Sequence, residues 1–151
     1  MRRTILASLL GALAAVAVAP AALAQTTAAA NAAPGAGAKY KVVFQVSDND
    51  PAKWNLALNN AANVQKDLGK ENVAIEIVAY GPGLNMLKSE SVAAGRINGA
   101  MDGGVAVMAC DNTMRAMKLT NADLIGGVGH VRAGVVELMM KQREGWSYIR
   151  P

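Results

Sequence analysis

The sequence has few of the side chains that most enzymes use for chemistry. Its 151 residues include a single cysteine, Cys110, and a single histidine, His130. One cysteine cannot form a disulfide within its own chain, and one histidine cannot build a multi-histidine metal site. No serine has the spacing of a nucleophile elbow, so classical hydrolase chemistry is disfavoured. The position of His130 in an expected strand indicates a satisfied or exposed side chain rather than a general base.

The first 24 residues have the pattern of a secretory signal peptide. Two arginines at positions 2 and 3 precede an almost purely apolar run, and the segment ends in Ala22-Leu23-Ala24, a small-residue cleavage site. We therefore predict a signal peptide over residues 1–24 and export, with the periplasm of a Gram-negative bacterium as the destination. The arginine pair also fits a twin-arginine signal, so the export route stays open. No later segment is long and apolar enough to span a bilayer, so no membrane span is expected after cleavage.

The remaining chain is nearly balanced in charge. Its formal net charge falls from +4 to +2 when the two arginines of the signal are removed. Lysine and arginine form no cluster that could follow a phosphate backbone, so a nucleic-acid partner is not expected. Residues 25–38 read QTTAAANAAPGAGA, and without charged, aromatic or large apolar side chains they are predicted to be a flexible Ala-rich linker. Residues 39–151 have a normal length for one domain.

Hydrophobic periodicity predicts strands that alternate with helices. A β-branched and aromatic run over 40–46 leads to Asp50, which can cap a helix that begins at Pro51 and ends near Gly69. One face of this helix is apolar and comprises Trp54, Ala57, Leu58, Ala61, Val64 and Leu68. Further strands are expected over 73–80, 105–109, 128–131 and 146–149, with helical segments over 84–98, 113–119 and 133–143. This alternation implies parallel pairing, and we predict a single α/β domain, a three-layer α/β/α sandwich with a mainly parallel sheet of about five strands.

Ligands in open α/β sheets gather at the carboxyl ends of the strands, where three loops are expected. These loops are Asp48-Asn49-Asp50, Gly81-Pro82-Gly83 and Cys110-Asp111-Asn112-Thr113. The first lacks glycine and glutamate at calcium-loop spacing, and helix capping explains its last aspartate. The second lacks the third glycine of a dinucleotide fingerprint and is interpreted as a tight turn. We therefore expect neither a bound metal nor a cofactor.

Cys110 is the most informative residue of the third loop. It lies where a strand ends and a helix begins, and the free amides of a helix start favour a thiolate and lower the thiol pKa. Arg115 and Lys118 add to this effect if their side chains turn back toward the sulfur, whereas Asp111 opposes it. The alternative is a packed cysteine that acts as a small apolar filler. An unpaired cysteine in an exported protein is buried, bridged between chains or used.

Four segments carry a resemblance to a known family. They are KVVFQVSDNDPAKWNLALNNAANV, VAYGPGLNML, CDNTMRAM and GVVELMMKQREGWSYIRP. Together they make residues 41–151 similar to the DsrE/DsrF-like family of small sulfur-relay proteins, most of all to exported members with uncharacterised roles. The resemblance implies a three-layer sandwich assembled as a homo-oligomer, commonly a trimer or hexamer. In sulfur-transferring members, the cysteine matched by Cys110 accepts sulfane sulfur as a persulfide and passes it on.

Three functional hypotheses follow. In the first, an exported sulfur carrier, similar to a sulfurtransferase, exchanges sulfur with donor or acceptor protein thiols through an accessible Cys110. In the second, Cys110 is a thiol redox sensor that links two chains or forms a reversible mixed disulfide. In the third, the domain is a non-catalytic binding module with a packed cysteine. The expected neighbours of the site are Asp48, Asn49, Tyr80, Gly81, Gly83, Asn112, Thr113 and Arg115.

Overall fold

The structure is a computed structural model that describes residues 37–151. The predicted signal peptide and residues 25–36 of the predicted linker lie outside the described residues. The strands are β1 Tyr40–Val46, β2 Val73–Ala79, β3 Ala106–Cys110, β4 Gly129–Val131 and β5 Ser147–Ile149. The helices are α1 Pro51–Leu68, η1 Gly81–Leu87, α2 Ala94–Asp102, α3 Asp111–Ala116, η2 Asn121–Asp123 and α4 Gly134–Arg143, of which η1 and η2 are 3-10 helices.

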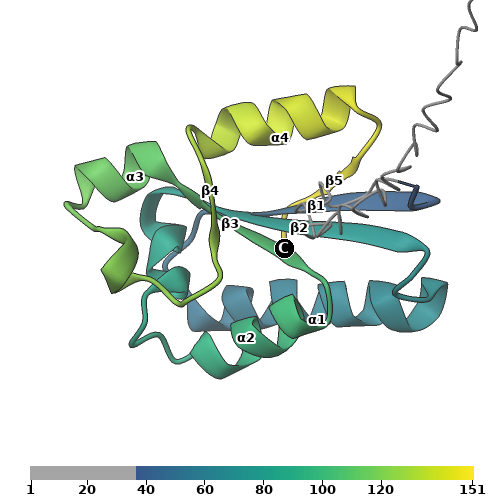
Figure 1. The fold of residues 1–151 in the computed structure, drawn as a ribbon, viewed down its shortest axis with the longest axis horizontal. Coiled ribbons are helices and arrows are strands. Elements are labelled where there is room, and N and C mark those ends of the chain that lie inside the picture. The colour runs from purple at the N-terminus through teal and green to yellow at the C-terminus, as the bar shows by residue number, and fades with distance from the viewer. Residues whose placement is uncertain (1–36) are drawn as a thin grey trace, which may run out of the picture. The chain divides into compact units, whose positions relative to one another are not determined.

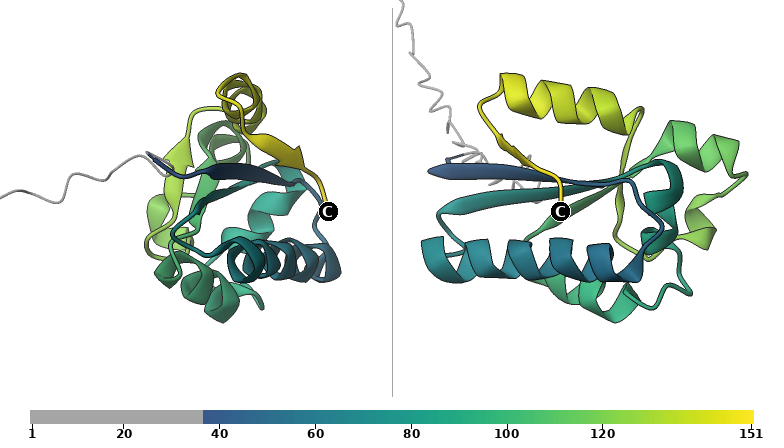
Figure 2. Two further views of the ribbon diagram at one scale, coloured as in Figure 1. Left: turned by 90° about the vertical axis from the view of Figure 1, so that its right-hand side faces the viewer. Right: turned by 180° about the vertical axis from the view of Figure 1, so that it is seen from behind.

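The five strands form one parallel sheet in the order β4-β3-β2-β1-β5. Helices α1 and α2 cover one face of this sheet and α4 covers the other (Figures 1 and 2). A large core fills the α1 and α2 side, and a smaller core with Val43, Val78 and Trp146 fills the α4 side. The predicted three-layer α/β/α sandwich is therefore confirmed.

Local sequence signals explain how the first helix begins and ends. The Asp50 carboxylate accepts a hydrogen bond from the Ala52 N–H at 2.8 Å, and Pro51 occupies the first helical position. Gly69 ends the helix with a positive φ of 82°, a backbone conformation that glycine adopts at little cost. Both predicted ends of α1 are therefore confirmed.

Two details of the predicted helices are wrong. Leu68 was expected on the buried face of α1 but is 37% exposed. Leu68 still faces the sheet, where it lines a hollow with Val64 and Val73, and this hollow leaves its side chain partly exposed. The helix after Cys110 begins at Asp111 instead of residue 113 and ends at Ala116 instead of residue 119. Lys118 adopts a positive φ of 56°, which a continuing α-helix cannot accommodate.

Candidate functional site

Cys110 is the last residue of β3 and the residue that precedes α3. Side chains alternate along a strand, so Cys110 shares a face with Met108, the face covered by α4. The start of α4 lies over the sulfur, and Cys110 is only 4% exposed. The expectation of an exposed, accessible sulfur was therefore wrong for the isolated chain.

The buried sulfur is surrounded by hydrogen-bond donors. The Gly134 N–H donates to the Cys110 Sγ at 3.2 Å. The Thr113 hydroxyl and the backbone N–H groups of Thr113 and Asn112 also favour the charged form of the sulfur. The Asn112 N–H donates its hydrogen bond to the Arg132 carbonyl at 3.3 Å. Burial raises the pKa of the Cys110 thiol, but these donors outweigh it and bring the pKa below its usual value. The environment therefore favours a thiolate although the sulfur has little contact with solvent.

Thr113 connects Cys110 to the loop after β2. Its Oγ1 accepts a hydrogen bond from the Gly81 N–H at 2.9 Å. Because the Thr113 oxygen accepts this bond through a lone pair, the hydroxyl proton is free to point at the sulfur. Gly81 begins the 3-10 helix η1 with a φ of 53°, so the predicted tight turn over residues 81–83 is in fact the first turn of a helix. Two of the three predicted loops therefore meet at Cys110.

Gly134 and Tyr80 form the opposite side of the sulfur environment. A Cβ atom at Gly134 would lie 3.0 Å from the Tyr80 Cβ and Cδ1 atoms, so a larger residue there would require Tyr80 or α4 to move by a few tenths of an ångström. Tyr80 was predicted near the site from the sequence, whereas Gly134 was not. A glycine at the start of an otherwise regular helix was the available signal, because glycine disfavours helix interiors.

The charged neighbours of Cys110 point elsewhere. Arg115 donates to the Asn112 Oδ1, and no hydrogen bond joins it to the sulfur. Asp111 pairs with His130, with 3.0 Å between the His130 Nδ1 and the Asp111 Oδ1. The condition under which Arg115 would favour the thiolate, a side chain turned back toward the sulfur, is therefore not met. Neutral donors, rather than neighbouring cations, lower the pKa of Cys110.

The loop after β1 lies apart from Cys110. Asp48 forms ion pairs with Lys53 at 3.2 Å and with Arg150 at 3.4 Å. The hydrogen bond from Lys53, together with Arg150, lowers the pKa of Asp48 despite an opposing contribution from burial. Strand β1 is separated from β3 by β2, which places this loop about 10 Å from the cysteine in the plane of the sheet. Asp48 and the exposed Asn49 are thus not brought to the sulfur.

Two hollows flank the loop that carries Cys110. One has a volume of about 540 Å³ and a largely apolar lining that includes Pro82, Thr113 and Met117. The other, of about 310 Å³, is lined by Asn112, Arg132, Ala133, Val136 and Glu137. Asn112 lines both hollows, whereas Cys110 lines neither. Both hollows therefore reach neighbours of the cysteine but not the sulfur itself.

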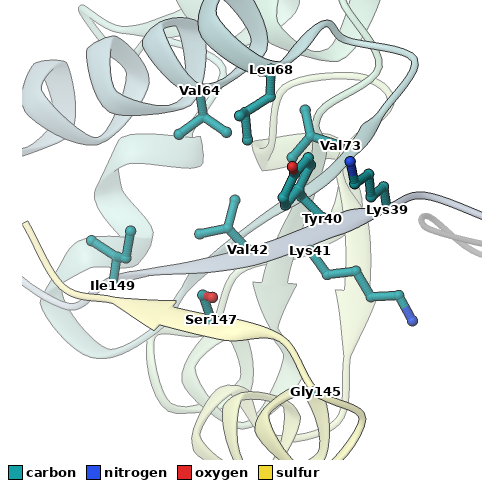
Figure 3. Close-up of a pocket in the computed structure, with 10 residues that line it drawn as sticks. All are labelled: Lys39, Tyr40, Lys41, Val42, Val64, Leu68, Val73, Gly145, Ser147 and Ile149. Atoms are coloured by element: carbon teal, nitrogen blue, oxygen red, sulfur yellow. The ribbon is translucent and has the colours of Figure 1, made fainter.

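A third hollow, of about 330 Å³, lies at the opposite end of β1, between α1 and β5 (Figure 3). Its lining includes Tyr40, Val64, Leu68 and Ile149 and contains no Asp, Glu, His or Cys. Because ligands in open α/β sheets bind at the carboxyl ends of the strands, this hollow is not a candidate for the chemistry of Cys110.

The described part of the chain offers neither a clustered metal site nor a membrane-spanning helix. Residues 37–151 contain no group of three or more His, Cys, Asp or Glu side chains placed to hold a metal ion. Over the same range, no helix combines the length and apolar character needed to cross a bilayer.

The fold and the site define a parallel α/β/α sandwich with a hydrogen-bonded thiol at the end of a central strand. The sequence profile of the DsrE/DsrF-like family matches residues 39–151, and the chain belongs to this family. The chain is 40% identical to a protein of unknown function from Methanobacterium thermoautotrophicum, with a TM-score of 0.71 over 74% of this chain and 99% of that one. A protein of unknown function from Bacteroides thetaiotaomicron shares the fold at 12% identity, with a TM-score of 0.61 over 74% of this chain and 94% of that one. No curated protein matches the sequence.

Proposed function

We propose that the protein carries sulfane sulfur on Cys110 as a persulfide. The observation that supports this most directly is the Gly134 N–H that donates to the sulfur, together with the polar groups of Thr113 and Asn112 that lower the pKa of the thiol. A thiolate is the form of cysteine that attacks sulfur. Membership of a family with sulfur-relay proteins supports the same chemistry.

The transfer takes place in two balanced steps. The Cys110 thiolate attacks the terminal sulfane sulfur of a donor, forming a new S–S bond while the donor's own S–S bond breaks and its electron pair leaves on the remaining sulfur. The thiolate of an acceptor protein then attacks the outer sulfur of the persulfide, and Cys110 leaves as a thiolate. No external oxidant or reductant is needed. Donor and acceptor approach through the two hollows beside Asn112.

Export is the second part of this proposal. The pattern of residues 1–24 supports it, with an arginine pair, an apolar run and a small-residue cleavage site. In this proposal the mature protein meets its donor and acceptor thiols in the periplasm.

The first experiment measures the intact mass of the mature protein, purified without reductant, before and after exposure to polysulfide. We expect a gain of about 32 Da per sulfur that is lost on reduction. The Cys110→Ser variant, which keeps a hydrogen-bonding side chain but no thiol, should gain nothing. A wild-type protein that takes up no sulfur, or a variant that takes up as much as the wild type, would overturn the carrier function.

The burial of Cys110 favours one alternative, the non-catalytic binding module. In that case the 4% exposed cysteine is a packed residue and the apolar hollow beside Thr113 holds a ligand. Alkylation of the native protein separates the two functions. A Cys110 that resists both sulfur loading and alkylation until the protein is denatured supports the binding module.

We also propose that the protein forms homo-oligomers through the outer face of α4. This helix exposes four large apolar side chains, Val135, Val136, Met139 and Met140. An exposed group of this kind is typical of a protein–protein contact. The hollow beside Asn112 includes Val136, so a second copy on this face would lie next to the site.

The substitution Met139→Lys tests this oligomer. Met139 is 59% exposed, so the lysine leaves the folded monomer intact but places a charge in the proposed contact. We expect light scattering to show a smaller assembly. The control is Leu56→Lys on α1, where an equally apolar side chain is 46% exposed, and this variant should keep the wild-type mass. A wild-type protein that is monomeric at micromolar concentration would contradict the proposal.

A further inference from the structure

Glu76 is a charged residue in the interior of the described domain. It lies in the middle of β2, is 1% exposed, and pairs in register with Val43 on β1 and Ala106 on β3. Ala74 and Val78 on the same strand belong to the core beneath α4. Because side chains alternate along a strand, Glu76 faces α4 as well. A carboxylate in this position requires a partner, since burial of an unpaired charge is strongly unfavourable.

Lys141 on α4 provides that partner. The Lys141 Nζ lies 2.8 Å from the Glu76 Oε2 and 3.5 Å from the Glu137 Oε1. The same ammonium group lies over the Trp146 ring, 4.4 Å from its centroid, within the range of a cation–π interaction. Burial opposes the charge on Lys141, but the two carboxylates outweigh it and raise the pKa of this lysine. The second oxygen of Glu76, Oε1, has no hydrogen-bond partner, so the pair with Lys141 is the main compensation for burying this carboxylate.

Few apolar contacts hold α4 on the sheet. Gly134 and Leu138 are its buried residues, and its outer side chains face away from the sheet. Removal of one partner of a buried ion pair leaves the other charge buried without compensation, which is strongly unfavourable. In a helix attached by one large buried apolar side chain, the Glu76–Lys141 pair is therefore the contact that defines how the helix lies on the strands.

The two ends of α4 connect this ion pair to the cysteine. Gly134 lies against Tyr80 and Cys110, and Lys141 lies against Glu76. Seven residues of helix span about 10 Å, and the four residues of chain from Glu76 to Tyr80 span about 13 Å. The helix therefore runs along the sheet from the cysteine to the glutamate, as Figure 1 shows for α4. A shift at one end moves the other, because a short helix behaves as a rigid rod.

We propose that Glu76 and Lys141 are positioning residues for Cys110, since their ion pair holds α4 where the Gly134 N–H meets the cysteine sulfur. This inference deepens the proposed function and rests on Cys110 acting as a thiolate. It assigns a role to a buried charge that lies on a different strand from the cysteine.

The test is the pH dependence of thiolate formation, measured by ultraviolet absorbance with the Cys110→Ser protein as the baseline. The chain has one cysteine, so this signal reports on Cys110 alone and does not require reagent access. In Lys141→Met and Glu76→Gln we expect the titration to move to higher pH and the alkylation rate at neutral pH to fall roughly three- to tenfold, the effect of weakening one donor to a charged group. Lys141→Arg, which keeps the charge, should restore most of the wild-type behaviour.

A purely structural role for the pair predicts a different result. The control is Ile97→Val, a buried change in α2 on the other face of the sheet, which lowers stability without contacting α4 and should keep the wild-type titration. If Lys141→Met and Glu76→Gln fold and their Cys110 titrates like that of the wild type, the inference is overturned. If Lys141→Met does not fold, Lys141→Gln makes the same comparison with a polar side chain. A third result separates the two proposals. If the wild-type protein takes up no sulfur but the Glu76 and Lys141 variants still titrate at higher pH, only the carrier function is refuted.

Discussion

Replacement of Gly83 by alanine is expected to lower the free energy of unfolding by about 3 kcal/mol, at the upper end of the usual range for an added buried atom. A Cβ atom at this position would lie 2.7 Å from the Val46 carbonyl carbon and 2.8 Å from the Ser47 Cα. Both are backbone atoms at the end of β1, so no side-chain rotation relieves the overlap. The first turn of η1 or the end of β1 has to move. Chemical denaturation followed by circular dichroism measures the loss.

Gly99→Ala is the matched control. Gly99 lies within α2, and a Cβ atom there would have open space around it. Alanine at this position should stabilise the domain by about 0.5–1 kcal/mol, because glycine is a poor helix former. A Gly83→Ala protein as stable as the wild type would show that η1 can relax away from β1. Gly83 was predicted from the sequence to lie near a ligand site, whereas its close packing against β1 already explains a glycine there.

Substitution of Thr113 by valine is expected to move the titration of Cys110 to higher pH and to slow its alkylation at neutral pH by about tenfold. The valine side chain has a similar shape but no hydroxyl, so the thiolate loses a donor while the sulfur stays buried. A hydrogen bond to a charged group contributes about 1.5–3 kcal/mol, and about 1.4 kcal/mol corresponds to a factor of ten. Since burial alone raises the pKa of Cys110 and the donors lower it, removing a donor raises the pKa.

The rate of alkylation as a function of pH measures this shift. Thr120→Val is the matched control, because it makes the same chemical change at the start of η2, where the Thr120 hydroxyl bonds to the Asp123 carboxylate at 2.7 Å. That variant loses a helix cap but should keep the wild-type profile of Cys110. Equal profiles for Thr113→Val and the wild type would mean that the Gly134 N–H and the backbone amides of α3 alone stabilise the thiolate.

Much of the fold could be predicted because its signals are local. Asp50 followed by Pro51 marks the start of α1, and Gly69 marks its end. Continuous apolar runs mark the buried strands of a sheet covered on both faces. The DsrE/DsrF-like resemblance added the family, which the match over residues 39–151 confirms.

The details of the site depend on contacts that local patterns do not contain. Cys110 is buried because the start of α4, at Gly134, lies over its sulfur. Gly134 follows the cysteine by 24 positions, and no residue close to Cys110 in the sequence indicates this contact. Arg115 bonds to Asn112 within its own helix turn, a choice of partner that depends on side-chain rotamers. Glu76 lies in an apolar run and is buried only because Lys141 reaches it from a helix 65 positions away.

The position of β1 in the sheet has a consequence for synthesis of the chain. This strand pairs with β2 on one side and on the other with β5, where Val42 lies opposite Ser147. The partner on that second side is therefore the last of the five strands to be made, and one edge of β1 stays open while the ribosome translates the intervening residues. Open strand edges are sites where nascent chains aggregate. The sheet is complete only when residues 147–149 have emerged, so β1 is an edge strand throughout the synthesis of α1 to α4.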